Sequence, residues 1–491
     1  MSQEHDVRTY TLGRPPSTTG LGGQSMKVTV LAGSTFFAFI VLLALNLGKL
    51  SLAVLFFGAI STVFVFVQVG PRSLAARIQL FFQVRKQRRN GEDLYVSGPD
   101  SKVPGGQFRL PGALARTELK ESVDSSGNDY ALAIDRPNNR ATVLLSAQLS
   151  GDVDRTREER DMQTSDWGRF EAGLSLSGNV ASCVVVISNR PGTGHLAHQE
   201  VRSHLDPNAP EIARQIQLEA ADLLSETAGE MECHMAVTFK ISGDARHDDE
   251  FIMNLDYTLP SFINALTWAG IEATPLDYEA TVARIRTFYD PATESAFEQM
   301  RVEGTPHGLS WENAGPSYAM NLRDSYVHEN CTSVTWEMVS APASTFEDFV
   351  LRPLVQPNVN IPRGRLAMIY MPIPASQGTK LVENEYKNAL VAMNSSKSVK
   401  KMHGTVRAEE ADGARRAVAR GSQVGLRSLM FTATGGPDDD MRKTRSAVIQ
   451  AAAQSNIQLQ EYKGMHDVGF AMTTGMGQTP RLQNTVSKIL K

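Results

Sequence analysis

Three histidines and a glutamate stand close together in the segment PGTGHLAHQEVRSH, at His195, His198, Glu200 and His204. Imidazole and carboxylate groups at such intervals could hold a zinc ion if the segment were helical, with His234 as a distant fourth ligand. However, Pro191-Gly192 opens the segment directly after an expected strand, so its first part is expected to be a connection rather than a helix. Solvated histidines need no metal partner, and we therefore expect no metal site.

Three consecutive aspartates, Asp438 to Asp440, form a second polar cluster. Adjacent carboxylates could bind a divalent cation. They also stand directly before a pattern that is typical of a helix, where carboxylates accept hydrogen bonds from backbone N–H groups and are stabilised by the helix dipole. We expect these aspartates to begin a helix rather than to bind a cation.

The signatures of nucleotide binding and of nucleophilic catalysis do not occur in the sequence. A P-loop needs Gly directly before a Lys-Ser/Thr pair, because backbone amides must wrap the phosphate. Ser396 precedes one such pair here, and Arg442 precedes the other. There is also no G-x-S-x-G motif. We expect no P-loop ATP binding, no cofactor and no catalytic residue; a membrane-tethered hydrolase that uses His195 is the alternative, for which no nucleophile–base pair is found.

Composition and charge indicate a globular protein in a reducing compartment. The chain has 491 residues, 42% of them hydrophobic and 21% charged, and this length predicts two or three folded units. A net charge of −4 gives no general attraction to nucleic acid, so we expect no specific nucleic-acid binding. Three cysteines without metal-ligand spacing are expected to be reduced thiols.

Two apolar runs near the N-terminus are the strongest signal in the sequence. Val28 to Leu47 and Leu52 to Val69 contain no ionisable side chain, and Gly48-Lys49-Leu50-Ser51 separates them. As helices, the runs would each be about 27–30 Å long, which matches the apolar thickness of a bilayer. A signal peptide is disfavoured, because a second run follows at once and no small-residue cleavage pattern ends the first. The sequence therefore predicts a transmembrane helical hairpin.

Basic residues after the second run predict its orientation. Lys49 is the only charge between the runs, and no acidic residue follows the second run before Glu92. The basic flank comprises Arg72, Arg77, Arg85, Lys86, Arg88 and Arg89. Because basic loops stay on the cytoplasmic side, both termini are expected in the cytoplasm. We thus expect a multi-pass protein of the cell membrane, in contact with lipid, whose body is cytoplasmic.

Beyond Leu94, short apolar runs alternate with helical patterns. Val180 to Ser188 is an expected strand, and 210–228 is an expected helix. A comparable series returns near the C-terminus. This order predicts an α/β (α+β) fold, in which the transmembrane hairpin is followed by two ferredoxin-like α/β units. The expected parts are a flexible cytoplasmic arm (1–26), the hairpin with its basic tail (27–90), a first α/β domain (94–290), a connecting region (291–360), a second α/β domain (361–477) and a C-terminal tail (478–491).

This order of parts resembles the PrgI-type membrane protein joined to the N-terminal region of the motor ATPase of type IV secretion (conjugation) machines. The string YALAIDRPNNRATVLLSAQLSG is similar to that family's opening hairpin, and IQLQEYKGMHDVGFAMTTGMG is similar to the end of its N-terminal region. In the family a P-loop ATPase domain follows, whereas here only a short tail follows Gly477. The best resemblance is to actinobacterial membrane proteins of integrative conjugative elements that lack this ATPase domain.

The resemblance implies a structural subunit that scaffolds or docks a separate P-loop motor ATPase, in an oligomeric complex with other secretion subunits. No nucleotide-binding residue is carried over. In the tail, Leu482, Val486 and Leu490 recur at four-residue spacing and form a candidate docking helix for the ATPase, with a frayed terminus as the alternative. A membrane core component of a type VII (ESX-like, EccE-type) secretion complex is the alternative function, and a neighbouring gene for a conjugation ATPase would favour the first.

Overall fold

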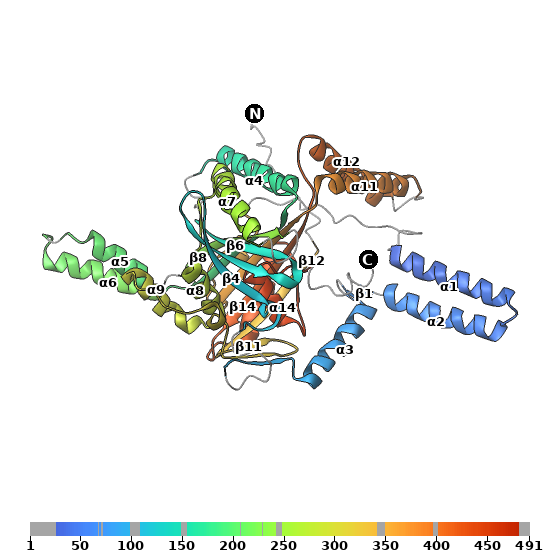
Figure 1. The fold of residues 1–491 in the computed structure, drawn as a ribbon, viewed down its shortest axis with the longest axis horizontal. Helices are drawn as coiled ribbons and strands as arrows, with labels where there is room; N and C mark the ends of the chain where they lie inside the picture. The colour runs from blue at the N-terminus through green and yellow to red at the C-terminus, as the bar shows by residue number, and fades with distance from the viewer. Residues whose placement is uncertain are drawn as a thin grey trace, which may run out of the picture.

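The body of the protein is built around one large antiparallel sheet. The computed structural model describes residues 26–480, apart from 67, 70–71, 99–108, 149–154, 207, 228, 242–247, 341–348 and 396–400. Helices make up 51% of the structure and strands 25%. The predicted mixture of helix and sheet is therefore confirmed. Paired helices extend from this body, and two of these pairs point in opposite directions (Figure 1).

The strands cross the sheet in an order that differs from their order in the sequence. From one edge to the other they are β3 (Leu94–Val96), β10 (Tyr318–Asn321), β11 (Tyr326–His328), β12 (Cys331–Ser340), β14 (Gly425–Gly435), β13 (Arg363–Pro372), β7 (Val180–Pro191), β8 (Gly229–Lys240), β6 (Arg140–Ala147), β5 (Asp129–Asp135) and β4 (Thr117–Val123). Two more strands lie off this path: β9 (Ala273–Pro275) pairs with β6, and β15 (Gln458–Glu461) pairs with β12.

Two groups of four strands repeat one topology. In the first group the order is β9–β6–β8–β7, and in the second it is β15–β12–β14–β13. In sequence order the strands of the first group are β6, β7, β8 and β9, and those of the second are β12, β13, β14 and β15. In both groups, the first of the four strands lies between the fourth and the third, and the second lies on the other side of the third. The two second strands, β7 and β13, pair antiparallel with Val186 opposite Ala367, so the groups join edge to edge. β12 lies in the segment that was expected to connect the two domains.

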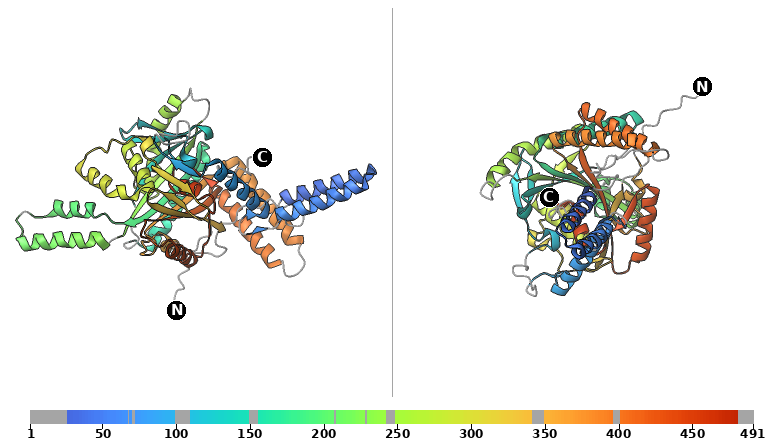
Figure 2. Two further views of the ribbon diagram at one scale, coloured as in Figure 1. Left: turned by 90° about the horizontal axis from the view of Figure 1, so that it is seen from below. Right: turned by 90° about the vertical axis from the view of Figure 1, so that its right-hand side faces the viewer.

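The helices also correspond between the two groups. A helical hairpin follows the second strand in each: α5 (His195–His204) with α6 (Glu211–Thr227), and α11 (Ala375–Ser395) with α12 (Lys401–Ala419). A single helix follows each third strand: α7 (Asp248–Trp268) in the first group and α13 (Met441–Gln454) in the second. After the first strand, the first group has α4 (Arg157–Ser177), and the second has the short α10 (Arg352–Val355). Figure 2 shows these helices around the sheet.

Local sequence explains where these elements form and end. β7 reads VASCVVVISNRP, and such β-branched runs favour strands that are buried on both faces. Thr156 and Glu159 form a reciprocal capping box at the start of α4. That helix ends at Gly178, whose φ of 71° is a conformation that glycine adopts without strain. The expected strand at 180–188 and the expected helix at 210–228 are both confirmed.

Hydrophobic clusters fill both faces of the sheet. On one face, α4 and α7 cover the first group, where Phe170 and Leu259 are buried, and α13 covers the second group near Trp336 and Phe431. On the other face, α8 (Tyr278–Tyr289) and α14 (His466–Thr473) form a third cluster that spans both groups. Each large apolar side chain that is buried in this way contributes about 1.5–3 kcal/mol.

The C-terminal end of the described chain crosses the sheet as a buried strap, defined here as Thr473–Thr479. Thr473 Oγ1 lies 2.9 Å from Thr432 Oγ1 on β14. The carbonyl of Thr474 lies 3.1 Å from Nε2 of His234 on β8. Further on, Gln478 Nε2 donates to Oδ2 of Asp135 on β5 at 3.2 Å. The strap thus ties the second group of strands to the first across the seam between β7 and β13.

Candidate functional site

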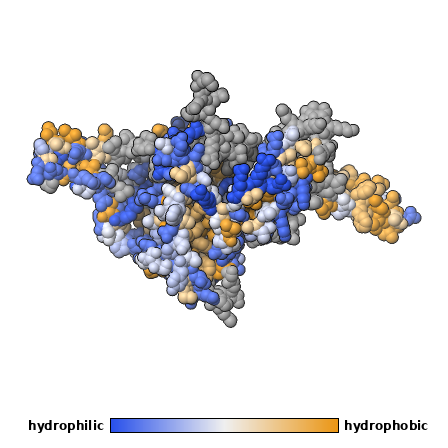
Figure 3. All heavy atoms as spheres, turned by 90° about the horizontal axis from the view of Figure 1, so that it is seen from above, coloured by the Kyte–Doolittle hydropathy of each residue, from blue (hydrophilic) through white to orange (hydrophobic). Residues whose placement is uncertain are grey.

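The helices α1 (Met26–Ala44) and α2 (Gly48–Phe66) form an apolar hairpin that projects from the body. Many of its apolar side chains face outward, and Phe37 and Phe57 are 69% and 67% exposed. Figure 3 shows the hairpin as a largely hydrophobic projection. Over the residues whose placement the structure describes, no helix combines the length and the apolar character needed to cross a membrane.

Hydroxyl groups within this hairpin donate hydrogen bonds to carbonyls of their own helices. Thr35 Oγ1 donates to the carbonyl of Leu31, and Thr62 Oγ1 donates to the carbonyl of Gly58, both at 2.8 Å. The helices approach closely at Gly58, where an added Cβ would meet the side chain of Thr35. The two helices are thus in close contact, and these two hydroxyl groups are bonded within their own helices.

The basic helix α3 (Leu74–Asn90) follows the hairpin. Arg85, Lys86 and Arg88 to Arg89 are on the part of the helix nearest the body, and Arg88 lies 4.0 Å from Asp93. Phe81 and Phe82 are 62% and 63% exposed on the same helix. The side chains of Arg72 and Arg77 lie outside the described part of the chain. The helix therefore presents exposed aromatic groups in its middle and basic groups at its end next to the body.

The first part of the histidine segment, 192–194, is a connection, as expected, and the histidines after it lie on helix α5, which begins at His195. The side chains are nevertheless directed to other partners. His195 Nε2 lies 2.7 Å from Ser295 Oγ, and His204 Nδ1 lies 3.0 Å from the carbonyl of Glu200. His234 is fully buried on β8 and bonded to the strap. Within the described ranges, no cluster of three or more His, Cys, Asp or Glu side chains could hold a metal.

The aspartates begin a helix, as predicted. Asp440 is the N-cap of α13, and its side chain accepts from the backbone N–H of Arg442 at 2.9 Å. Asp439 accepts from the N–H of Gly436 at 2.8 Å. The predicted docking helix of the tail, with Leu482, Val486 and Leu490, lies outside the described residues.

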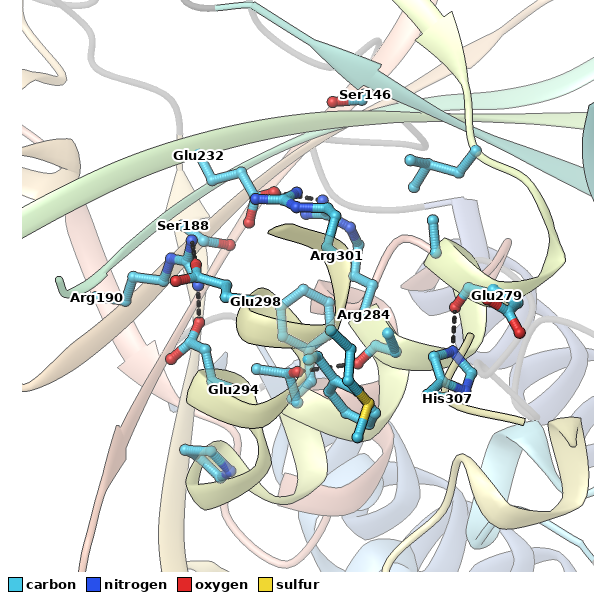
Figure 4. A pocket seen from close by; sticks show the side chains of 18 of the residues that line it. Ser146, Ser188, Arg190, Glu232, Glu279, Arg284, Glu294, Glu298, Arg301 and His307 are labelled. Carbon is cyan, nitrogen blue, oxygen red and sulfur yellow. Dashed lines mark hydrogen bonds and ion pairs between the residues drawn. The ribbon is translucent and has the colours of Figure 1, made fainter. Parts of the chain in front are cut away.

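A charged cavity of about 470 Å³ lies where β7, β8 and β13 meet α8 and α9 (Glu294–Glu303). Figure 4 shows Arg190 beside Glu294 and Glu298. The guanidinium of Arg190 forms ion pairs with both, at 2.7 Å to Glu298, and also lies 3.1 Å from Glu230. Nearby carboxylates raise the pKa of Arg190 above its usual value, against the effect of burial. This network fixes the start of α9 to the end of β7.

A second ion pair lines the same cavity. Arg284 of α8 forms an ion pair with Glu232 of β8. Burial alone would raise the pKa of Glu232, but the positive charge of Arg284 outweighs this effect and lowers that pKa to about 2. Arg284 Nη1 also lies 3.5 Å from Nδ1 of His234. Burial and the adjacent Arg284 charge lower the pKa of His234 to about 3, so its imidazole is neutral at physiological pH. The site therefore holds a neutral histidine beside a paired arginine.

Sequence analysis did not identify these cavity residues. The signal that could have found them is a charged residue inside a strand that is otherwise apolar, as in RGRLAMIYMP, where Arg365 occupies a buried position. Pairing partners such as Glu294 come from a distant helix and carry no local signal.

Comparison with known proteins assigns no family, since no protein-family model and no curated protein matches the chain. The apolar hairpin, the basic helix and the charged cavity are therefore the features from which a function can be inferred.

Proposed function

We propose that the protein is a membrane-anchored structural subunit of a conjugative type IV secretion apparatus, with hairpin α1–α2 inserted in the cell membrane. The observation that carries the membrane anchoring is the exposed apolar surface of the hairpin, which the body leaves uncovered (Figure 3), and the assignment to type IV secretion rests on the resemblance of the sequence at 130–151 and 457–477. Its apolar sequence extends from Val28 to Leu47 and from Leu52 to Val69. Side chains such as Phe37 and Phe57 would be unfavourable in water and favourable in lipid.

The basic helix α3 supports the orientation with both termini in the cytoplasm. Its positive charges suit the anionic lipid headgroups of the inner leaflet, while Phe81 and Phe82 suit the interface between headgroups and acyl chains. This arrangement supports a body on the cytoplasmic side. A neutral or acidic flank would give no such preference.

The body suits a scaffold. We propose that each repeated group of strands is a ferredoxin-like unit, since the order fourth–first–third–second is the one found in that fold. One sheet through both units provides a rigid frame. On the side away from α1–α2, the α5–α6 hairpin extends outward (Figures 1 and 2). Its exposed Ile212, Ile216 and Leu223 are 69%, 60% and 66% exposed and offer an apolar stripe for another protein.

Docking of a separate P-loop motor ATPase is tested by co-purification. We expect the full-length chain to recover the ATPase of its own conjugative element. Replacing Ile212, Ile216 and Leu223 with serine should reduce that recovery about tenfold or more, because hot-spot side chains each contribute roughly 1–2 kcal/mol. Serine substitutions at the exposed Met162 and Leu176 of α4 are the matched control and should leave recovery unchanged.

The tail is tested in the same assay. Gln478 and Thr479 are buried in the body, so a deletion that spares the fold begins at Arg481. If Leu482, Val486 and Leu490 dock the ATPase, deletion of 481–491 lowers its recovery; unchanged recovery removes the tail from the interface. Failure of the full-length chain to recover any ATPase counts against the docking proposal itself.

A further inference from the structure

Arg365 is a buried cation in the middle of the sheet. Arg365 is 6% exposed. Its guanidinium carbon lies 4.2 Å from the ring centre of Phe288 and 4.3 Å from that of Phe470. Its Nη2 lies 3.5 Å from Thr473 Oγ1. Across the described residues, no carboxylate forms an ion pair with it. Burying a charge without an opposite charge costs several kcal/mol, and this burial lowers the pKa of Arg365 to about 9.

Arg365 lines the charged cavity together with a second buried donor. Ser188 stands directly opposite Arg365 in the pairing of β7 with β13, so both side chains are on the same face of the sheet. In the described structure, neither Ser188 Oγ nor Arg365 Nε has a hydrogen-bond partner. Two buried donors with unused capacity therefore stand side by side in the cavity wall, and buried polar groups normally have partners.

Three other arginines that line the cavity have carboxylate partners, and the fourth, Arg301, is exposed. Arg190 pairs with Glu294 and Glu298, Arg284 pairs with Glu232, and Arg363 lies 2.5 Å from Glu294. Among the buried arginines of the described cavity wall, Arg365 is thus left without a carboxylate partner; Figure 4 shows Arg190 and Arg284 with their carboxylate partners. The remaining wall includes the apolar residues Leu276, Phe288, Phe297 and Met300, and the acidic residues Asp277 and Glu279 also line the cavity.

We propose that this cavity binds a small organic carboxylate, whose carboxyl group pairs with Arg365 and accepts a hydrogen bond from Ser188. A planar guanidinium matches a carboxylate in geometry, and one unpaired positive charge matches a single negative charge. The apolar wall holds the body of the ligand, and the cavity volume is in the range of small-molecule sites. A doubly charged phosphate would leave one charge unpaired in the interior.

The test uses the purified full-length chain and isothermal titration calorimetry with two carboxylates, butyrate and phenylacetate. Their neutral analogues, butyramide and phenylacetamide, have nearly the same shape and no charge. We expect saturable binding of at least one carboxylate and affinity about tenfold or more lower for its amide, because the charged hydrogen bonds are lost. Arg365→Gln should weaken the carboxylate by a similar factor, and Ser188→Ala should weaken it less.

Arg427→Gln is the matched control, since Arg427 is on the adjacent strand β14 and pairs with Glu171 away from the cavity. It should leave binding unchanged. If Arg365→Gln fails to fold, Ser188→Ala and the comparison of each acid with its amide still test the proposal. Equal affinity for acid and amide, full affinity in Arg365→Gln, or no binding of either carboxylate overturns the proposal. Preference for inorganic phosphate over both carboxylates also overturns it.

Discussion

Deleting residues 26–66 is expected to move the protein from the membrane fraction to the soluble fraction while the body still folds. The hydrophobic core of the described structure begins at Leu110, so the hairpin contributes no side chain to it. The outward-facing residues of α1 and α2 include many large apolar side chains, each worth about 1.5–3 kcal/mol when transferred from water. Their sum makes release nearly complete rather than partial. Fractionation after carbonate extraction measures this, and circular dichroism of the released chain checks the fold.

Serine substitutions at Ile212, Ile216 and Leu223 are the control for this deletion. They also remove exposed apolar side chains, but from α6, which lies at the opposite end of the molecule from the hairpin (Figure 1). This variant should remain in the membrane fraction. A deletion variant that stays with the membrane after carbonate extraction would show that another part of the chain provides the anchor.

Gly477→Ala is expected to destabilise the body by about 3 kcal/mol or more, measured as the free energy of unfolding in denaturant. Gly477 has a φ of 72°, a conformation that costs an alanine about 1–2 kcal/mol. In addition, its added Cβ would lie 2.4 Å from Thr142 Oγ1 and 3.2 Å from Thr238 Oγ1, inside the closed contact between strap and sheet. Because the strap crosses the seam between the two groups of strands, its displacement also exposes buried side chains of the core.

Gly304→Ala separates the cost of the backbone conformation from the cost of the steric contact. Gly304 has a similar φ of 67°, but an added Cβ would meet nothing within 4 Å. This variant should lose only about 1 kcal/mol, the cost of the backbone conformation alone. Equal losses of unfolding free energy in Gly477→Ala and Gly304→Ala would show that the strap can move at no cost in stability. In that case it does not hold the two groups of strands together.

The parts of the fold that depend on local sequence could be predicted. The β-branched run of β7 and the aspartate cap of α13 each follow from short-range rules that act within a few residues. Helical periodicity likewise located α6. The helix α5 was missed because Pro191 and Gly192 belong to the end of β7 and the turn after it, and the helix starts only at His195.

The parts that depend on distant contacts could not be predicted. Pairing of β7 with β13 joins residues far apart in the sequence, and neither strand carries a signal for the other. The cavity also depends on contacts between residues far apart in the sequence, since Arg190 is on β7 and its partner Glu294 is on α9. The buried role of Thr473–Thr479 depends on Thr142 and Asp135, which are again remote in sequence. Such contacts are settled by the whole packed structure.

Cysteine labelling of intact cells tests the proposed membrane topology most directly. The native Cys183, Cys233 and Cys331 are buried, and burial raises the pKa of each thiol, so their background reaction is low. Lys49→Cys places a thiol near the turn between α1 and α2, and Glu250→Cys places one at an exposed position of α7. A membrane-impermeant maleimide should label Lys49→Cys in intact cells and Glu250→Cys only after lysis. Labelling of Glu250→Cys in intact cells, with Lys49→Cys protected, would contradict the account.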